Sequence, residues 1–451
     1  MALNAFTNIF RIAELRTRLA YTIGLLAVYR IGIFITVPGV DRAAMNAFME
    51  AQRQAGGVVN LLNLFSGGAL EQMSIFGLGI MPYVSASIII QLLAAVVPTF
   101  ERLQKEGAAG RQKLNQYTRY GTIVLSVVQG VGISRWLATL GRSPQQGGFD
   151  PGQVVVPEDS FWFTAMTVIT LTAGTAFIMW LGERITERGI GNGISLIIFA
   201  GIVAAIPSSA KQLFDMTAQD ALNIGALLGL VVFMLLLVAV VVYVERGMRR
   251  IPVQYAKRMA GRRMFAGQAT YFPMKVNSAG VIPPIFAGAV LSFPATLANW
   301  IPFLGTVNQA LMQYPWIYQG VFVVMVLFFT FFYVSLTFKP EDVADNIKKQ
   351  GGYIPGIRPG RQTADFIERV LNRITLGGAI YLAAICVIPY ALSATLGVPF
   401  QFGGTALLIV VGVALDFVQQ VEGHLISRNY EGFAGPRGPR IRGRMRAATT
   451  A

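Results

Sequence analysis

Cysteine, histidine and charge are all scarce in this sequence of 451 residues. The single cysteine, Cys386, cannot form a disulfide within the chain, and the single histidine, His424, excludes metal motifs that need two histidines. No Gly-Lys dipeptide occurs, so the chain has no Walker A phosphate loop. A Ser-His-Asp triad could use only His424, which is better explained as a helix-end residue near a membrane surface. The residue inventory therefore argues against an enzyme and predicts neither a cofactor nor a metal site.

Charged residues make up only 13% of the chain, about half of the roughly 25% expected for a soluble domain. Apolar residues make up 54%, which excludes an intrinsically disordered chain as well as a soluble enzyme of this length. The 37 Lys and Arg residues outnumber the 22 Asp and Glu residues, for a net charge of +15. This composition predicts an integral membrane protein with basic edges.

Several stretches are apolar enough to cross a hydrocarbon core, which takes roughly 20 residues in a helix. The ten predicted spans cover residues 19–37, 73–98, 119–140, 160–181, 192–206, 222–244, 278–299, 316–338, 374–394 and 404–426. The sequence therefore predicts an all-α, polytopic membrane protein with ten transmembrane helices.

The Lys and Arg residues are distributed very unequally between the two sides of the predicted membrane. With the N-terminus inside, 31 of them fall on the cytoplasmic side and 5 on the other side. The positive-inside rule then puts both termini in the cytoplasm. Ten spans arranged this way divide into two halves of opposite orientation, residues 1–210 and 211–451, as in an inverted repeat. This division rests on topology alone.

Two features depart from plain spanning helices. The stretch 58–65 is apolar but too short to span, and glycine pairs bracket it. It is either an interfacial helix or a short helix that folds back into a cavity. Polar groups at membrane depth are sparse, and we expect Arg30 to pair with Asp416. The lack of carboxylates near the midplane argues against an ion-coupled small-solute transporter, which is the alternative function that ten spans suggest.

Two cytoplasmic connections, 245–277 and 339–373, are long and basic. The positive-inside rule explains their charge, but it does not explain their length, because loops this long are usually functional. We infer a large acidic partner, either protein or RNA.

Six strings in the sequence together resemble the SecY family of protein-conducting channels, and its bacterial branch fits best. They are LFSGGALEQMSIFGLGIMPYVSASIIIQLL (64–93), LGERITERGIGNGISLIIFAGI (181–202), VERGMRRIPVQYAKR (244–258), KVNSAGVIPPIFAGAV (275–290), GGYIPGIRPGRQT (351–363) and FGGTALLIVVGVALDF (402–417). They occur in the family's order and at its spacing, and the resemblance runs from about residue 10 to residue 430.

The resemblance implies an hourglass channel between two pseudo-symmetric halves, with a ring of aliphatic side chains at its waist. The matching positions are Ile80, Val84, Ile198, Ile285 and Ile409. Such a ring can seal by dewetting and can deform around a passing chain without binding it. The short helix at about 58–70 matches the plug beneath the ring, with Asn60, Leu61, Leu62, Asn63, Leu64 and Phe65 at its centre.

The family also opens sideways between spans two and seven, so that a signal helix can enter the lipid. Ser85 and Phe293 match positions across this lateral gate, and Gln91, Gln129 and Asn192 match a polar cluster behind it. The residues that match docking positions for the motor or the ribosome are Tyr255, Lys257, Arg258 and Arg358. The Pro283-Pro284 pair departs from the usual single proline in span seven.

The resemblance implies the pore subunit of the general secretion translocon in the inner membrane of a bacterium. The implied partners are the small membrane subunits SecE and SecG, the SecA motor ATPase, the ribosome, signal-bearing precursor polypeptides and membrane lipid. The chain itself would catalyse no bond chemistry.

Overall fold

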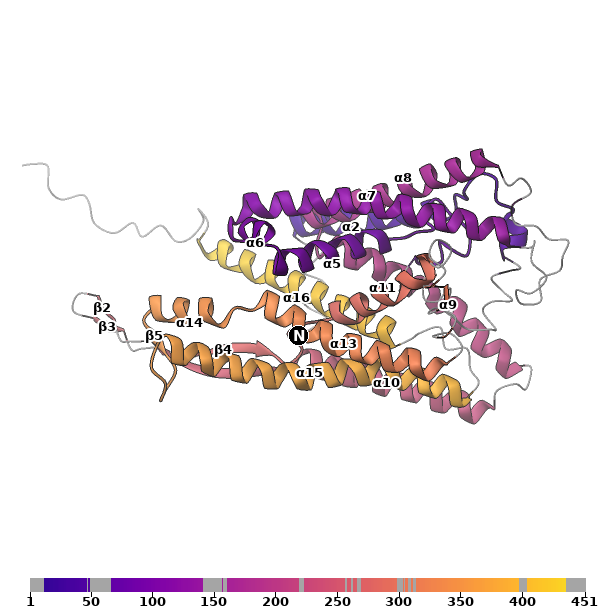
Figure 1. Ribbon diagram of the computed structural model, residues 1–451. Coiled ribbons are helices and arrows are strands. Elements are labelled where there is room, and N and C mark those ends of the chain that lie inside the picture. Colours follow the sequence, from indigo (N-terminus) through magenta and orange to yellow (C-terminus); the bar gives the residue numbers. More distant parts are fainter. Residues whose placement is uncertain are drawn as a thin grey trace, which may run out of the picture.

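The computed structural model describes residues 12–46, 48, 66–140, 156, 160–218, 223–255, 258–260, 263–265, 269–297, 303, 305–306, 310, 314–396 and 404–434. Its long helices run side by side in one bundle (Figure 1). They are α2 (Ala13–Gly32), α5 (Met81–Val96), α7 (Ala108–Thr139), α8 (Phe161–Arg188), α9 (Gly193–Ala218), α10 (Ile224–Glu245), α11 (Ile282–Leu297), α13 (Pro315–Thr337), α15 (Arg361–Leu396) and α16 (Gly404–Ala434). Each of the ten predicted spans therefore has a helical counterpart.

The described helices are suited to a membrane. Seven helical stretches, in α7, α8, α9, α10, α13, α15 and α16, are long and apolar enough to cross one, and α5 with the following helix α6 (Pro98–Lys105) would add an eighth. In α10 only 17% of the spanning window is buried, and Leu228, Leu235 and Leu236 are all more than half exposed. An apolar surface of this extent is stable against lipid and not against water. The predicted polytopic membrane protein is confirmed.

The second span begins later than predicted. Residues 66–80 form turns, and α5 begins only at Met81. Pro82 lies in the first turn of α5, where its missing N–H costs no helical hydrogen bond, and Gly79 precedes the helix with a φ of 56° that glycine tolerates. At the other end Val97 is extended before Pro98, so α6 leaves α5 at an angle of 98°.

The two long connections are structured. Residues 245–277 contain the strands β1 (Met248–Tyr255) and β4 (Ala269–Lys275), with β2 (Arg258–Ala260) and β3 (Arg263–Phe265) between them. Residues 339–373 contain the helix α14 (Pro340–Lys349), the strand β5 (Gly352–Tyr353) and the first turns of α15, which begins well before the predicted residue 374. The prediction of a purely α-helical chain therefore holds for the spanning part only.

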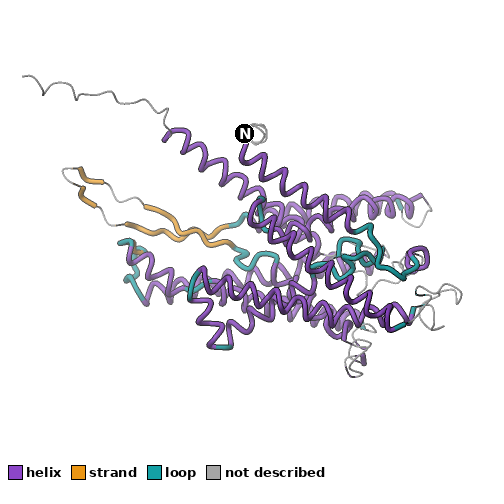
Figure 2. Tube along the Cα trace, turned by 90° about the horizontal axis from the view of Figure 1, so that it is seen from above, coloured by secondary structure: helices purple, strands orange, loops and turns teal. Residues whose placement is uncertain are grey.

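Strand β1 joins these two connections into one antiparallel sheet of order β4-β1-β5. Ile251 of β1 pairs with Phe272 of β4, and Gln254 of β1 pairs with Tyr353 of β5. The strands project from the bundle at the end that also carries α6 and α14 (Figures 1 and 2). Bases such as Lys105, Arg250 and Lys348 lie on these elements, so we call this the basic end of the molecule.

The helices form two groups that meet in the middle. One group packs α2, α5, α7, α8 and α9 together, and the other packs α10, α11, α13, α15 and α16. Two sets of contacts join the groups: α9 packs on α16 and α10, and α11 packs on α5 and α7. The first group contains the counterparts of spans one to five and the second those of spans six to ten, whereas the predicted boundary after residue 210 falls inside α9, which continues to Ala218.

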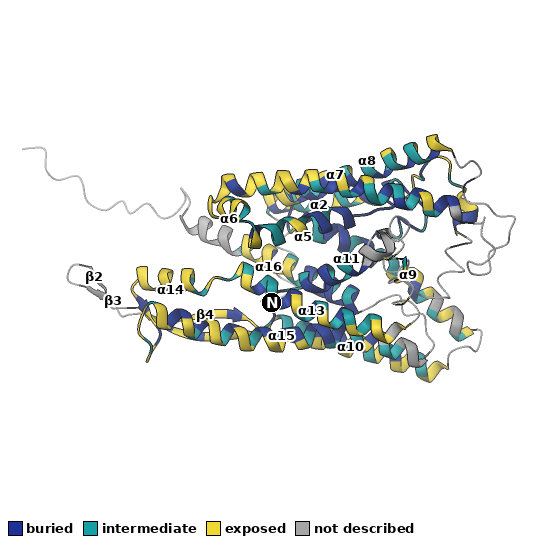
Figure 3. Cartoon of the chain, viewed as in Figure 1, coloured by how far each residue is buried: buried dark blue, intermediate teal, exposed yellow. Residues whose placement is uncertain are grey.

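The largest hydrophobic core lies where the two groups meet. It contains Ile80 and Ile198 from one group and Val241, Phe286 and Leu408 from the other. Buried residues gather towards the middle of the bundle, whereas exposed ones lie on its outer faces (Figure 3). Because both the core and the lipid are apolar, close packing has to hold the helices together.

Glycines provide this close packing. At Gly174 in α8, an added Cβ would collide with the backbone carbonyl of Ile75. At Gly404, the start of α16, it would collide with the carbonyl of Ile385 in α15. Side chains at these positions would push whole backbone segments apart.

We expect Gly174→Ala to lower the melting temperature of the purified protein, because over-packing typically costs about 1–3 kcal/mol. The matched control is Gly24→Ala in α2, where no atom lies within 4 Å of the added Cβ. This control should melt at or slightly above the wild-type temperature, since alanine is the better helix former. Thermal unfolding in one detergent compares the three proteins, and equal melting temperatures would contradict the packing role of Gly174.

Candidate functional site

The five aliphatic residues predicted at the waist all belong to the large central core or pack against it. Ile80, Val84, Ile198 and Ile409 are buried members of the central core, and Ile285 is partly buried and packs against it. Ile80 and Val84 come from the start of α5, Ile198 from α9, Ile285 from α11 and Ile409 from α16. The structure therefore brings together side chains from four helices of both groups.

The described end of the predicted plug, residues 66–70, forms turns and not a helix, and it packs against α9. Residues 60–65, the centre of that prediction, lie outside the described residues. Gly67 approaches α9 so closely that an added Cβ would lie 2.7 Å from the Cα of Gly201, one turn beyond Ile198. Tyr29 Oη donates a hydrogen bond to the carbonyl of Ser66 at 3.1 Å. Ser66 is thus hydrogen-bonded to α2, and Gly67 packs against α9 one turn from Ile198.

Arg30 helps to hold the same segment. Its Nη1 donates to the carbonyl oxygen of Gly67 at 3.0 Å. Asp416 lies exposed on α16, and no ion pair between it and Arg30 is found in the described part of the chain. The expected pair is therefore wrong, because the tertiary fold offers Arg30 a backbone carbonyl nearby.

The two helices expected to flank a lateral opening, α5 and α11, are in contact. Ser85 is only 2% exposed in α5, and Met81, Val84 and Ile88 of the same helix share the central core with Phe286 of α11. Phe293 lies in α11, but its side chain is outside the described set. The surface between these helices is mostly apolar.

The three amides predicted to cluster behind this opening have separate environments. Gln91 Nε2 donates to Ser87 Oγ at 3.1 Å within α5, and Gln129 is partly buried in α7. Asn192 precedes α9, where its Oδ1 accepts from the backbone N–H of Ile194 at 3.1 Å and so caps that helix. Among the described residues no hydrogen bond joins Gln91, Gln129 and Asn192 to one another.

At the basic end, two tyrosine–glutamine hydrogen bonds link the segment 245–277 to the segment 339–373. Tyr255 Oη donates to Gln350 Oε1 at 3.3 Å, and Tyr353 Oη donates to Gln254 Oε1 at 2.9 Å. Beneath them Ile251, Val253 and Ile347 form a separate hydrophobic core with residues from α13 and α15. The sequence did not predict that these two segments form one sheet, because the pairing of β1 with β5 joins residues about a hundred positions apart.

The other predicted docking residues lie nearby or outside the described set. Arg358 is exposed in the turn between β5 and α15, and its carbonyl oxygen accepts from Thr363 Oγ1 at 2.9 Å. Lys257 lies outside the described residues, as does the side chain of Arg258 in β2. The structure therefore places Tyr255 and Arg358 at the same end of the molecule.

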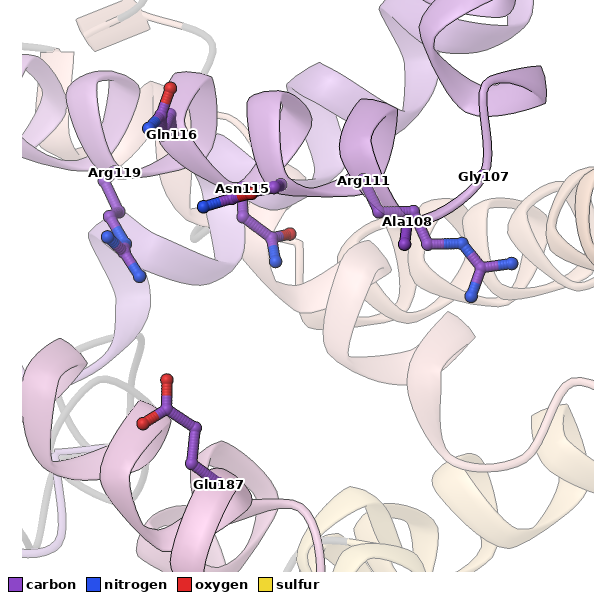
Figure 4. Close-up of a pocket in the computed structure, with 8 residues that line it drawn as sticks. Gly107, Ala108, Arg111, Asn115, Gln116, Arg119 and Glu187 are labelled. Carbon is purple, nitrogen blue, oxygen red and sulfur yellow. The ribbon is translucent and has the colours of Figure 1, made fainter.

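A polar pocket of about 560 Å³ at the basic end was not predicted (Figure 4). Its lining comes from the start of α7 and from α8: Gly107, Ala108, Arg111, Gln112, Asn115, Gln116, Arg119 and Glu187. Arg119 pairs with Glu183 at 2.7 Å, and Glu187 pairs with Arg184 at 2.9 Å. The pocket therefore offers mainly amides, which can hydrogen-bond a peptide backbone. The signal in the sequence was the spacing of Gln112, Asn115, Gln116 and Arg119 on one helix face.

Titratable groups do not assemble into a metal site in the described ranges. No group of three His, Cys, Asp or Glu side chains that could hold a metal ion occurs there. At the basic end, the hydrogen bond from Lys105 and its positive charge hold the pKa of the Glu101 carboxyl below its usual value.

Comparison with known proteins gives consistent matches over nearly the whole chain. A family model described as SecY matches residues 74–418. Protein translocase subunit SecY of Escherichia coli strain K12 is 49% identical over 426 residues, which cover 93% of this chain and 94% of that protein.

Two solved structures have the same fold. One is described as the structure of a protein conducting channel, with a TM-score of 0.63, 17% identity, and coverage of 92% of this chain and 94% of that one. The other, Sec61 in the canine ribosome-channel complex from the endoplasmic reticulum, has a TM-score of 0.59 at 17% identity and the same coverage. At these identities the two structures support the fold and not the details of the site.

Proposed function

The chain belongs to the SecY family, and from this membership we propose that it is the channel subunit of a protein translocase. It conducts unfolded polypeptides across the membrane and is not an enzyme. The observation that supports the proposal is that Ile80, Val84, Ile198, Ile285 and Ile409 all belong to the apolar core between the two helix groups or pack against it. In a channel for polypeptides, this cluster is the place where the two halves can part.

The aliphatic cluster seals the resting channel. Side chains of this kind repel water and ions, so a narrow ring of them blocks leakage without any charged group. They also make no directional bonds, so they close around many different passing side chains with little preference. The turn at Ser66–Leu70, packed beside Ile198, supports a plug formed by the preceding residues 60–65.

The contact between α5 and α11 is the lateral gate. A signal helix of roughly 20 apolar residues gains free energy on entering lipid, so it needs only a gap between these two helices. In this proposal Ser85 of α5 and Phe293 of α11 flank the gap, with Gln91 on α5, Gln129 on α7 and Asn192 just before α9 as the neighbouring polar groups. Apolar contacts suit this role, because they can be replaced by contacts with the signal helix.

The basic end faces the cytoplasm, and both termini lie on that side. The split of 31 to 5 in Lys and Arg residues supports this orientation. The predicted halves, 1–210 and 211–451, remain our division of the chain into the moving parts of the gate, although α9 continues across that boundary to Ala218. Because its relatives are bacterial, we place the chain in the plasma membrane of a bacterium.

The sheet at the basic end is the docking platform for the motor and the ribosome. We assign Tyr255 and Arg358 to this platform, which β1 and β5 make into one unit, and we propose that Lys257 and Arg258, which follow β1 in the sequence, add to it. A basic surface suits both ribosomal RNA and acidic protein segments. SecA and the ribosome dock there, whereas SecE, SecG and lipid contact the spanning helices.

Reconstitution tests the proposed function as a whole. The purified chain is placed in vesicles with its small partner subunits, and a SecA motor, ATP and a signal-bearing precursor are added. We expect the precursor to become resistant to external protease, because the channel conducts it into the vesicle. A precursor that stays protease-sensitive while a small solute accumulates would instead support the transporter alternative.

Replacing Ile198 and Ile409 together with serine should raise the resting ion conductance of the channel. The hydroxyl groups allow water to occupy the ring, and ions follow water. Conductance across planar bilayers without precursor measures the effect, which we expect to be about tenfold or more. The control is Ile169→Ser, which lies on the outer face of α8 with 68% of the side chain exposed. Unchanged conductance in the double variant would remove these residues from the ring.

Arg358→Glu should impair motor-driven transport more than ribosome-driven insertion. Charge reversal at this turn opposes an acidic surface of the motor, whereas the ribosome has further basic contacts on β1 and its neighbours. The matched control is Arg361→Glu, three residues away and equally exposed. Both reactions are measured on the same vesicles, and equal losses in the two would contradict the assigned role.

A further inference from the structure

The start of the gate helix α11 is fastened to α10 by one buried amide. Asn277 Nδ2 donates to Glu245 Oε1 at 2.7 Å and to the carbonyl oxygen of Gly280 at 3.1 Å. Both partners are acceptors, so the orientation of the amide is fixed by its surroundings. Asn277 is only 3% exposed, and Glu245 is the last residue of α10. The hydrogen bond therefore links the end of one helix to the segment that leads into the next.

The same segment is held at two further places. The backbone N–H of Val276 donates to the carbonyl oxygen of Gly247 at 3.0 Å. An added Cβ at Gly378 in α15 would lie 2.9 Å from the carbonyl oxygen of Val276, and one at Gly412 in α16 would lie 2.6 Å from Val281. Residues 276–281 are thus enclosed by α10, α15 and α16, which all belong to the same half.

Beyond this base, α11 has contacts on both sides. Phe286 packs edge-to-face on Phe329 and Tyr333 of α13, with ring centroids 5.8 and 6.4 Å apart. On the other side α11 contacts α5 and α7 of the opposite half. Because its base is packed against α10, α15 and α16 and Gly280 sits in a left-handed turn with a φ of 62°, this base is the point about which α11 can pivot away from α5.

We propose that Asn277 and Glu245 are positioning residues that hold α11 in its closed position against α5. This inference rests on the proposed gate between the two helices. The hydrogen bond is strong, because its acceptor is a carboxylate and its donor is shielded from water. Lys275 and Asp416 lie close enough to Glu245 to interact with its charge, but neither is recorded as hydrogen-bonded to Asn277.

Asn277→Asp tests the proposal directly. The variant replaces the donor with a carboxylate at the same place, next to the carboxylate of Glu245. Repulsion then displaces the base of α11 and favours the open gate. We expect export of a reporter with a weakened signal sequence to rise about tenfold, since a hydrogen bond to a charged group controls an equilibrium by at least that factor. Asn277→Leu, which removes the donor without repulsion, should act in the same direction but less strongly.

Combining Asn277→Asp with Glu245→Gln should restore the closed gate. The amide introduced at 245 can donate to the carboxylate introduced at 277, so the hydrogen bond returns with donor and acceptor exchanged. Export of the weakened-signal reporter should fall to within about twofold of the wild-type level. The matched control is Ser278→Ala, since Ser278 Oγ donates only to the nearby carbonyl oxygen of Lys275, at 2.8 Å. This control should leave export unchanged.

A merely structural role would give a different pattern. Thermal unfolding and export of a reporter with an intact signal are measured on every variant, and we expect both to change little while the weakened-signal export changes strongly. If Asn277→Asp leaves weakened-signal export at the wild-type level, or if the double variant fails to restore it, the positioning role is wrong. If the wild-type chain exports neither reporter, the proposed channel function fails first, and this outcome is distinct from failure of the tether alone.

Discussion

The aliphatic contact between the two helix groups is the interaction on which the rest of this structure depends. Ile80, Val84 and Ile198 on one side and Ile409 on the other exclude water from the centre of the bundle. Lipid outside the helices is equally apolar, so the burial of apolar side chains contributes little free energy to the association of the two halves. In the proposed channel, this contact seals the resting pore and is replaced by contacts with a passing chain.

Other parts of the molecule compensate for this weak centre. Within the first half, Gly174 of α8 lets the turn at Ile75 approach its backbone, and within the second half Gly378 of α15 does the same for Val276. Between the halves, the backbone N–H of Gly191 donates to Gln420 Oε1 at 2.8 Å near the contact of α9 with α16. Polar and close-packed contacts thus lie inside each half and on the α9–α16 side, while apolar contacts dominate between α5 and α11.

The sheet at the basic end lies outside the membrane, so burial of apolar side chains away from water can stabilise it. Val253 and Ile347 are buried there in a small core of their own, and two tyrosine–glutamine hydrogen bonds close its edge. This core also includes Val334 of α13 and Leu371 of α15. A partner bound to the sheet is therefore mechanically connected to the half of the channel that carries α11.

The membrane class, the ten helices and the basic sides were determined by the sequence alone, because the hydrophobic length of a span and the location of Lys and Arg are local properties. The choice of Ile80, Val84, Ile198, Ile285 and Ile409 needed the family resemblance, since nothing in the periodicity distinguishes them from other aliphatic residues. Only the tertiary structure decided that Arg30 bonds to Gly67 and not to Asp416, that β1 pairs with β5, and that Asn277 reaches Glu245. These partners are 32 or more positions apart, and long-range pairing depends on how the helices pack and not on any pattern along the chain.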